Sequence, residues 1–234
     1  MTIQDELMLR RLEKAIVADI PGYERRVKED SGLMKFYNFF VQAFNKTFMT
    51  QYITTAHPHV YFPRKTMENT RTVWKVLAHE WIHMHHAKKE TVVLHSFLYG
   101  LPQWLTLLSL VSLGAIWGGP WWLLNLCWLI CIAPLPAYFR AKEERSAYVT
   151  NMAVNYWRYG SITQYTKDWL GKQFYESSYY FMWPFKGAVN KWMDEEEENI
   201  VAGKYDDLAP YNEVRILIEE IWPESKKKRS RPSP

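Results

Sequence analysis

The segment His79-Glu80-Trp81-Ile82-His83 has the residue types and spacing needed to bind a metal ion and activate water. On an α-helix, residues four apart lie on one face, so the imidazoles of His79 and His83 can reach a single ion. Glu80 would lie beside the open coordination position, where it can take a proton from metal-bound water. The pattern therefore predicts a zinc site with Glu80 as general base.

The residues around this pattern predict the helix that it needs. Val73, Val76 and Leu77 lie in step with His83, which indicates a helix over about residues 69–89 with one apolar face. The alternative is a histidine-rich helix that matches by accident. The apolar-faced helix favours a real metal site over that alternative.

The other histidines fit this ion less well. His86 lies seven residues after His79, which is a rise of about 10 Å along a helix, whereas zinc–nitrogen bonds are about 2 Å long. We interpret His85 and His86 as supporting or surface residues. His57 and His59 precede a short strand and are interpreted as turn or surface residues, with a place at a cleft edge as the alternative.

A third ligand is expected from another helix, because no further histidine follows at a suitable spacing. Glu143 and Glu144 begin a polar segment after a long apolar stretch, and Ala147 would allow close packing against the motif helix. We predict Glu144 as the ligand and Glu143 as the reserve. An ordinary solvated helix start, where acidic residues are favoured, is the alternative for both.

Residues 91–139 contain no Asp, Glu, Lys or Arg. Gly118-Gly119-Pro120 divides this stretch into two apolar runs, residues 101–117 and 121–139, each close to the roughly 20 residues that cross a bilayer as a helix. Two crossings would return Glu144 to the side of His79, as shared coordination requires. The alternative is a helical hairpin buried in a soluble domain or in a protein assembly.

Basic residues flank this apolar hairpin on both sides. Lys88 and Lys89 precede it, and Arg140 and Lys142 follow it. Because cytoplasmic flanks are enriched in Lys and Arg, a membrane-associated chain would place its metal site on the cytoplasmic side.

The chain of 234 residues is long enough for one domain with a substantial core. We expect an α+β fold, mostly helical with a small sheet and an apolar helical hairpin. Helices are expected over residues 5–18, 33–48, 69–89, 140–159 and 213–222, and the helix over residues 33–48 is expected to have a wide buried aromatic face. Strands are expected over residues 52–55 and 60–62. The expected parts are residues 1–90 with N-terminal helices, short strands and the motif helix, 91–139 with the apolar hairpin, 140–223 with C-terminal helices that complete the metal site, and 224–234 as a basic tail.

The net charge of +4 is small and comes largely from the basic run at residues 226–231. A solvated tail explains that run more simply than contact with phosphates, so no nucleic-acid partner is expected. Cys127 and Cys131 lie within the apolar stretch and are interpreted as small buried apolar residues.

These residues together resemble a known group of enzymes. A helix with HExxH, an apolar hairpin and then Glu144 with Ala147 resemble the gluzincin branch of zincin-like zinc peptidases. The chain is also similar to HtpX-type membrane peptidases and, more closely, to small zincin-like metallopeptidases of tailed bacteriophages. The similarity covers about residues 35–160 and includes residues 52–55, 60–63 and 134–141. Where HtpX-type enzymes carry an aspartate, this chain has Tyr148.

The resemblance implies a zincin-like fold, bound Zn²⁺ and hydrolysis of a polypeptide substrate, in a phage particle, at a host membrane or in an infected cell. It also implies that a substrate strand pairs with a sheet edge, for which residues 57–62 are the candidate. A transition-state donor is expected too, and the candidates are Tyr148, Tyr156, Tyr179 and Tyr180.

Two rival functions remain open. One is a zincin-like structural protein of a membrane or virion, without catalysis. The other is a chaperone-like or membrane-remodelling hairpin protein with an accidental motif.

Overall fold

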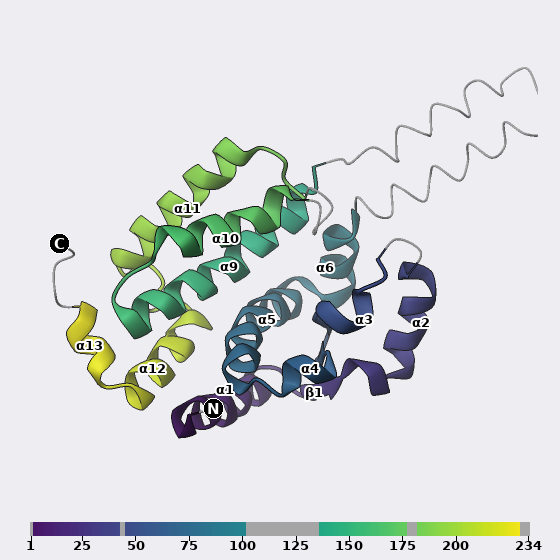
Figure 1. Ribbon diagram of the computed structural model, residues 1–234, viewed down its shortest axis with the longest axis horizontal. Coiled ribbons are helices and arrows are strands. Elements are labelled where there is room, and N and C mark those ends of the chain that lie inside the picture. The colour runs from purple at the N-terminus through teal and green to yellow at the C-terminus, as the bar shows by residue number, and fades with distance from the viewer. Residues whose placement is uncertain (1, 43–44, 102–135, 177–181, 230–234) are drawn as a thin grey trace, which may run out of the picture. The chain divides into compact units, whose positions relative to one another are not determined.

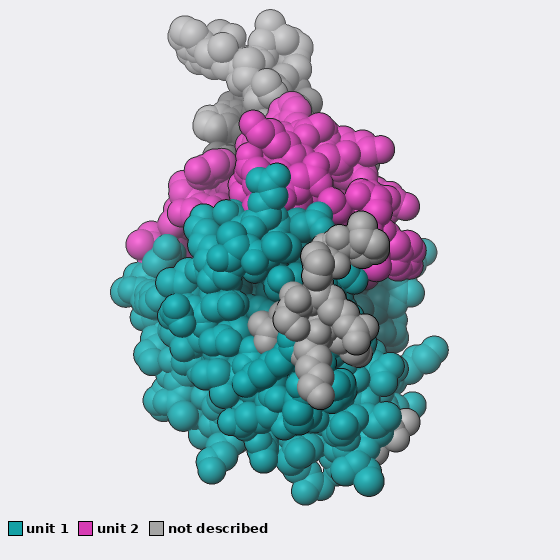
Figure 2. Space-filling model, turned by 90° about the vertical axis from the view of Figure 1, so that its left-hand side faces the viewer, with its two compact units in different colours: residues 1–92, 147–162, 197–234 teal, residues 93–146, 163–196 magenta. Residues whose placement is uncertain are grey.

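The computed structural model describes residues 2–42, 45–101, 136–176 and 182–229 (Figure 1). These residues form a mostly helical chain with one three-stranded sheet, so the expected α+β class is confirmed. The chain divides into two compact units, coloured teal and magenta in Figure 2. Unit 1 comprises Met1–Val92, Ala147–Ile162 and Glu197–Pro234, and unit 2 comprises Val93–Ser146 and Thr163–Glu196.

Unit 1 is built around three helices: α1 (Ile3–Asp19), α5 (Thr70–Glu90) and α12 (Tyr211–Ile221). Helix α1 packs against both α5 and α12. Thr2 caps its start, because the Thr2 hydroxyl accepts a hydrogen bond from the Asp5 backbone N–H, and the helix ends before Pro21 and Gly22. Met8 and Leu12 are fully buried. The predicted helices over residues 5–18, 69–89 and 213–222 are therefore confirmed.

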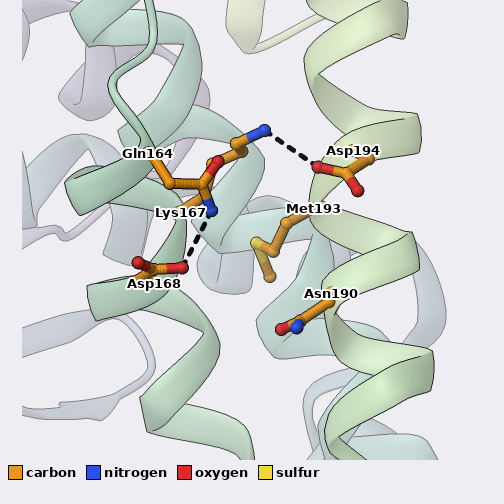
Figure 3. Close-up of a pocket in the computed structure, with 6 residues that line it drawn as sticks. All are labelled: Gln164, Lys167, Asp168, Asn190, Met193 and Asp194. Atoms are coloured by element: carbon orange, nitrogen blue, oxygen red, sulfur yellow. Dashed lines mark hydrogen bonds and ion pairs between the residues drawn. The ribbon is translucent and has the colours of Figure 1, made fainter.

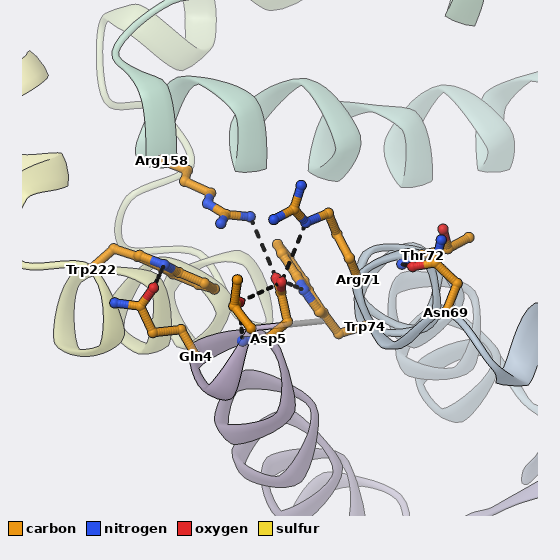
Figure 4. A network of polar contacts seen from close by, with 9 residues as sticks. Gln4, Asp5, Asn69, Arg71, Thr72, Trp74, Arg158 and Trp222 are labelled. Atoms are coloured by element: carbon orange, nitrogen blue, oxygen red, sulfur yellow. Dashed lines mark hydrogen bonds and ion pairs between the residues drawn. The ribbon is translucent and has the colours of Figure 1, made fainter.

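A buried carboxylate links three helices of unit 1 (Figure 4). Asp5 is 1 % exposed and accepts hydrogen bonds from Trp74 Nε1 at 3.1 Å and from Arg71 Nε at 3.3 Å. Arg158, on the part of α9 (Tyr138–Tyr159) within unit 1, completes the network. Burial alone would raise the pKa of Asp5, but the hydrogen bonds from Thr2 and Trp74 and the two arginine charges together lower it. The ionised carboxylate thus holds α1, α5 and α9 together.

The sheet of unit 1 has the strand order β1-β3-β2. Strand β3 (His59–Phe62) pairs in parallel with β1 (Glu24–Val27) and antiparallel with β2 (Thr54–Ala56). The two predicted strands are confirmed, and β1 was not predicted because Glu-Arg-Arg-Val shows no apolar alternation. The expectation that residues 57–62 form a sheet edge is wrong, because β3 is the central strand; β2 and β1 are the edges.

Helix α2 (Gly32–Val41) is shorter and more exposed than predicted. The expected helix over residues 33–48 ends at Val41, and α3 (Phe48–Gln51) is a separate turn. Met34 is the residue of α2 that is buried, whereas Phe36, Phe39 and Phe40 are 61 %, 69 % and 56 % exposed. The predicted wide buried face is therefore wrong, because the aromatic side chains of α2 point away from the core. The remaining short elements of unit 1 are η1 (Lys28–Asp30), α4 (Arg64–Met67) and α13 (Glu224–Arg229).

Unit 2 contains most of α6 (Val92–Tyr99), the first part of α9, α10 (Gln164–Tyr175) and most of α11 (Lys186–Val201). Helix α9 confirms the helix predicted over residues 140–159. C-terminal helices were expected within residues 140–223, but the bounds of α10 and α11 were not predicted. Phe174 and Val189 are fully buried, and the acidic run lies on α11.

The apolar hairpin predicted over residues 101–139 falls largely on residues 102–135, which lie outside the described residues, as do Cys127 and Cys131. Within residues 2–42, 45–101, 136–176 and 182–229, no helix has both the length and the apolar character that crossing a bilayer requires.

Candidate metal centre

Two histidines of α5 and one glutamate of α9 lie close enough to hold a metal ion. His79, His83 and Glu144 are 7 %, 8 % and 4 % exposed. Each offers one ligand atom, and these atoms all lie within 4.8 Å of one another. The imidazole centroids of His79 and His83 are 5.1 Å apart, as the one-turn spacing predicts. The structure thus brings together the three residues that the sequence analysis selected as ligands.

The packing of α9 explains why Glu144 is available for this role. Tyr148 and Asn151, on the same helix, both contact His79: the rings of Tyr148 and His79 have centroids 4.7 Å apart, and Asn151 Oδ1 lies 3.1 Å from His79 Nδ1. Glu144 lies four residues before Tyr148 and seven before Asn151, so the three share one helix face. The face of α9 that contacts His79 therefore also carries the glutamate.

The Asn151 contact determines which nitrogen of His79 can bind a metal. A side-chain amide oxygen only accepts hydrogen bonds, so Nδ1 is the protonated nitrogen of His79, and its N–H donates a hydrogen bond to Asn151 Oδ1. The lone pair of the imidazole is then on Nε2. Metal-binding histidines commonly have such a partner, which fixes the tautomer and the ring orientation. Asn151 was missed in the sequence analysis, and its spacing of two helical turns from Glu144 is the signal that could have found it.

We expect Asn151→Ala to weaken zinc binding by about 10–100-fold, because His79 would lose the partner that orients its ring. A competition titration against a chromophoric zinc chelator would measure the dissociation constant. Asn155→Ala, one turn further along α9, is the matched control and should leave affinity unchanged. Equal affinities of the wild type and Asn151→Ala would contradict this role.

Glu80 is held by a residue of the sheet. The hydroxyl of Thr55, on the edge strand β2, donates a hydrogen bond of 2.7 Å to Glu80 Oε2. This contact fixes the orientation of the carboxylate and leaves Oε1 as its second acceptor atom. Thr55 lies in the predicted strand over residues 52–55, but a sequence gives no sign that this strand contacts Glu80.

A buried lysine anchors the segment that carries Thr55. Lys28 is fully buried, and its ammonium donates to the carbonyl oxygens of Phe48 and Tyr52 at 2.8 and 2.9 Å and to Thr54 Oγ1 at 2.8 Å. Burial lowers the pKa of Lys28 to about 7. Because Thr54 immediately precedes Thr55, Lys28 holds the chain next to the residue that orients Glu80.

This buried lysine should make stability depend on pH. The folded protein releases the Lys28 proton near pH 7, whereas the unfolded chain keeps it to about pH 10.5. The unfolded state therefore binds more protons in between, and the free energy of unfolding should rise with pH, by up to about 1.4 kcal/mol per pH unit. Urea unfolding at pH 7 and pH 9.5 should show a larger rise in the free energy of unfolding for the wild type than for Lys28→Met. Lys14 is exposed, so Lys14→Met should show the same rise in the free energy of unfolding as the wild type. If Lys28→Met shows that rise too, the lowered pKa of Lys28 is not its cause.

Within unit 2, Glu144 has an orienting partner of its own. The hydroxyl of Tyr99, near the end of α6, donates a hydrogen bond to Glu144 Oε1. The Arg140 guanidinium lies 5.2 Å from the centroid of the Tyr99 ring. Tyr99 was not selected from the sequence, because it lies 45 residues from Glu144 in a stretch that shows only apolar character.

A second group of possible ligands shares His83. The ligand atoms of His83, His95 and Glu143 also lie within 4.8 Å of one another, with Glu143 half-buried. Glu143, the reserve ligand of the sequence analysis, thus lies near His83 rather than being an ordinary solvated residue. His95 was not considered as a ligand, because it lies in the stretch interpreted as an apolar hairpin.

The remaining histidines lie in neither group within the described part of the chain. His85 instead bonds through Nδ1 to Asp19 Oδ2 at 2.8 Å, and the same carboxylate accepts hydrogen bonds from Trp81 Nε1 at 2.8 Å and Lys88 Nζ at 2.9 Å. Burial would raise the pKa of Asp19, but these three donors lower it. The cluster ties the motif helix to the end of α1. His57, His59 and His86 are likewise outside both groups.

Of the four tyrosines considered as transition-state donors, Tyr148 lies against His79 and is 5 % exposed. Tyr156 is half-buried on α9. Tyr179 and Tyr180 lie outside the described residues.

A small polar pocket lies elsewhere, between α10 and α11 in unit 2 (Figure 3). Its volume is about 120 Å³, and its polar side chains pair with one another: Lys167 with Asp194 and Gln164 with Asp168, each at 2.8 Å. Its lining contains neither histidine nor cysteine. It therefore lacks the imidazole and thiolate ligands that are typical of zinc sites.

Comparison with known proteins identifies no relative. No family model, no curated protein and no solved structure matches the chain. The function must therefore be argued from the side chains of the candidate metal centre.

Proposed function

We propose that this protein is a zinc-dependent peptidase in which Glu80 acts as general base. The observation that carries the proposal is the burial of His79 and His83 on one helix face with Glu144 close enough to complete a metal site. Glu80, on the same helix, is held by Thr55 rather than belonging to the ligand group. A purely structural site has no use for such an additional carboxylate.

The donor set suits zinc better than calcium or magnesium. Two imidazoles and one carboxylate are typical of catalytic zinc sites, which leave one coordination position open. Calcium and magnesium prefer oxygen ligands and more of them. The burial of all three side chains also limits competition by bulk water. Zinc is therefore the ion that we expect at this site.

Zinc, when bound, would act as a Lewis acid that lowers the pKa of water and polarises a peptide carbonyl. The chain supplies the remaining functions. Thr55 holds Glu80 Oε2, so Oε1 is the atom that would accept the proton of the attacking water and later deliver it to the amine leaving group. Asn151 keeps His79 in the tautomer with its lone pair on Nε2.

The sheet suggests how a polypeptide substrate would be held. Strand β2 is an edge of the sheet and carries Thr55, which contacts Glu80. An extended peptide added to this edge would form backbone hydrogen bonds that need no particular side chain. We therefore assign the substrate edge to β2 in place of residues 57–62.

One observation favours a second candidate function, a structural metal site without catalysis. His95 and Glu143 lie near His83, so they could add protein ligands and close the coordination shell. A shell of four protein ligands leaves no position for water. X-ray absorption at the zinc edge would distinguish the two, because the peptidase needs a non-protein oxygen in the shell.

The test of the proposed function is metal content together with hydrolysis. Purified wild-type protein should contain about one zinc per chain by elemental analysis and should cleave casein. Dialysis against a chelator should abolish cleavage and lower the melting temperature, and added zinc should restore both. No zinc in carefully prepared protein, even after the metal is offered, would exclude the proposal.

A further inference from the structure

Helix α2 carries a cluster of exposed apolar side chains, which we call the aromatic face. Its members are 45–69 % exposed: Leu33, Phe36, Tyr37, Phe39 and Phe40. The rings form one patch, because Phe40 lies 5.2 Å, centroid to centroid, from both Phe36 and Phe39. Met34 is the side chain of α2 that is buried. The helix therefore contributes little to the core of unit 1 and directs most of its apolar surface outward.

Such a surface is costly to leave in water. Each large side chain that stays exposed loses the favourable free energy of transfer out of water. Single exposed apolar residues are normal, but a contiguous patch indicates an interaction site. The aromatic face is therefore a surface for contact with a partner.

The charges around the patch indicate the chemistry of that partner. Residues 31–67 contain no Asp or Glu. Lys35, within α2, and Lys46, shortly after it, are both exposed. Large apolar side chains beside basic residues, in a segment that lacks acidic residues, are typical of segments that lie on anionic lipid bilayers.

The rest of the sequence favours a lipid surface over a protein partner. The same chain contains the uncharged residues 91–139, whose two apolar runs are each near the length that spans a bilayer. Tyr37 also suits an interfacial position, because its ring is apolar and its hydroxyl is polar. We propose that α2 lies on the surface of an anionic bilayer, with the aromatic face inserted and Lys35 and Lys46 near the headgroups. This inference does not depend on the metal centre.

A site-specific probe tests the proposal, because residues 91–139 could bind vesicles independently. Trifluoromethyl-phenylalanine would be placed at position 39 of the full chain and, as a matched control, at position 165. Tyr165 is an aromatic residue of α10 that is 78 % exposed. Vesicles of phosphatidylcholine with 30 % phosphatidylglycerol and a lipid-bound nitroxide should broaden the fluorine signal at position 39 and not at position 165.

Changes of salt, lipid charge and side chain test the electrostatic and apolar parts of the contact separately. Because the attraction is partly electrostatic, neutral phosphatidylcholine vesicles or 0.5 M salt should weaken the effect at position 39. The double variant Phe36→Ser/Phe40→Ser should require at least about tenfold more lipid for the same broadening. Tyr165→Ser should require no more than the wild type.

Three results would overturn the proposal. The first is vesicle binding without broadening at position 39, which would assign the contact to another segment. The second is equal broadening at both positions. The third is a signal at position 39 that changes with protein concentration and not with lipid, which would identify a second copy of the chain as the partner.

Discussion

Glu80→Gln should leave zinc bound and lower the rate of peptide hydrolysis by about 10²–10⁴-fold. The substitution keeps the shape of the side chain and its hydrogen bond with Thr55 but removes the group that accepts a proton. Because Glu80 is not in the ligand group, the zinc content should stay at the wild-type value. The measurement is kcat on a fluorogenic peptide, with zinc determined on the same samples.

The matched control for this experiment is Glu90→Gln, at the exposed end of the same helix. It removes the same charge from α5 and should leave both zinc content and kcat unchanged. If Glu80→Gln keeps wild-type activity, Glu80 is not the base. If Glu80→Gln loses zinc together with activity, the carboxylate supports the metal site and its catalytic role is not established.

The parts of the site that follow helical periodicity could be predicted from the sequence. The spacing of His79 and His83 alone places both on one helix face, and the structure has that helix over Thr70–Glu90. Glu144 was harder to find, because it lies 61 residues beyond His83 and no local pattern links the two. Its selection rested on chain topology and on Ala147, which is fully buried.

The supporting contacts could not be predicted, because they depend on how distant segments pack. Thr55 reaches Glu80 only because β2 is an edge of the sheet beside α5. The strand order depends on β1, whose four residues are mostly charged and give no strand pattern. Asn151 lies two helical turns from Glu144, but that spacing does not show its contact with His79 until the packing face of α9 is known.

Helix α2 shows the limit of inference from apolar spacing. Phe36, Phe39 and Phe40 recur at three and four residues, which normally indicates a face packed against the core. The same spacing also describes a face that contacts a lipid bilayer, because both environments remove apolar side chains from water. A sequence pattern reports that a face avoids water, and only the packing shows what it contacts.

The ligand variants should separate the two groups of metal-binding side chains. His83 belongs to both groups, so His83→Ala should abolish stoichiometric zinc binding whichever group holds the ion. His86→Ala, three residues along the same helix and outside both groups, is the control and should keep about one zinc per chain. Retention of zinc by His83→Ala would exclude both groups at once.

The two glutamates then decide which group binds. If Glu144 is the ligand, Glu144→Gln should weaken zinc binding by more than the roughly 10–100-fold that loss of a supporting hydrogen bond costs. Glu143→Gln should then retain zinc and activity. If both variants lose zinc, the shell contains both carboxylates, and the closed structural site becomes the better account of the protein. Neighbouring residues on a helix point about 100° apart, so Glu143→Gln and Glu144→Gln remove carboxylates from different positions. The zinc dissociation constants of the two variants therefore distinguish an open catalytic coordination shell from a closed structural one.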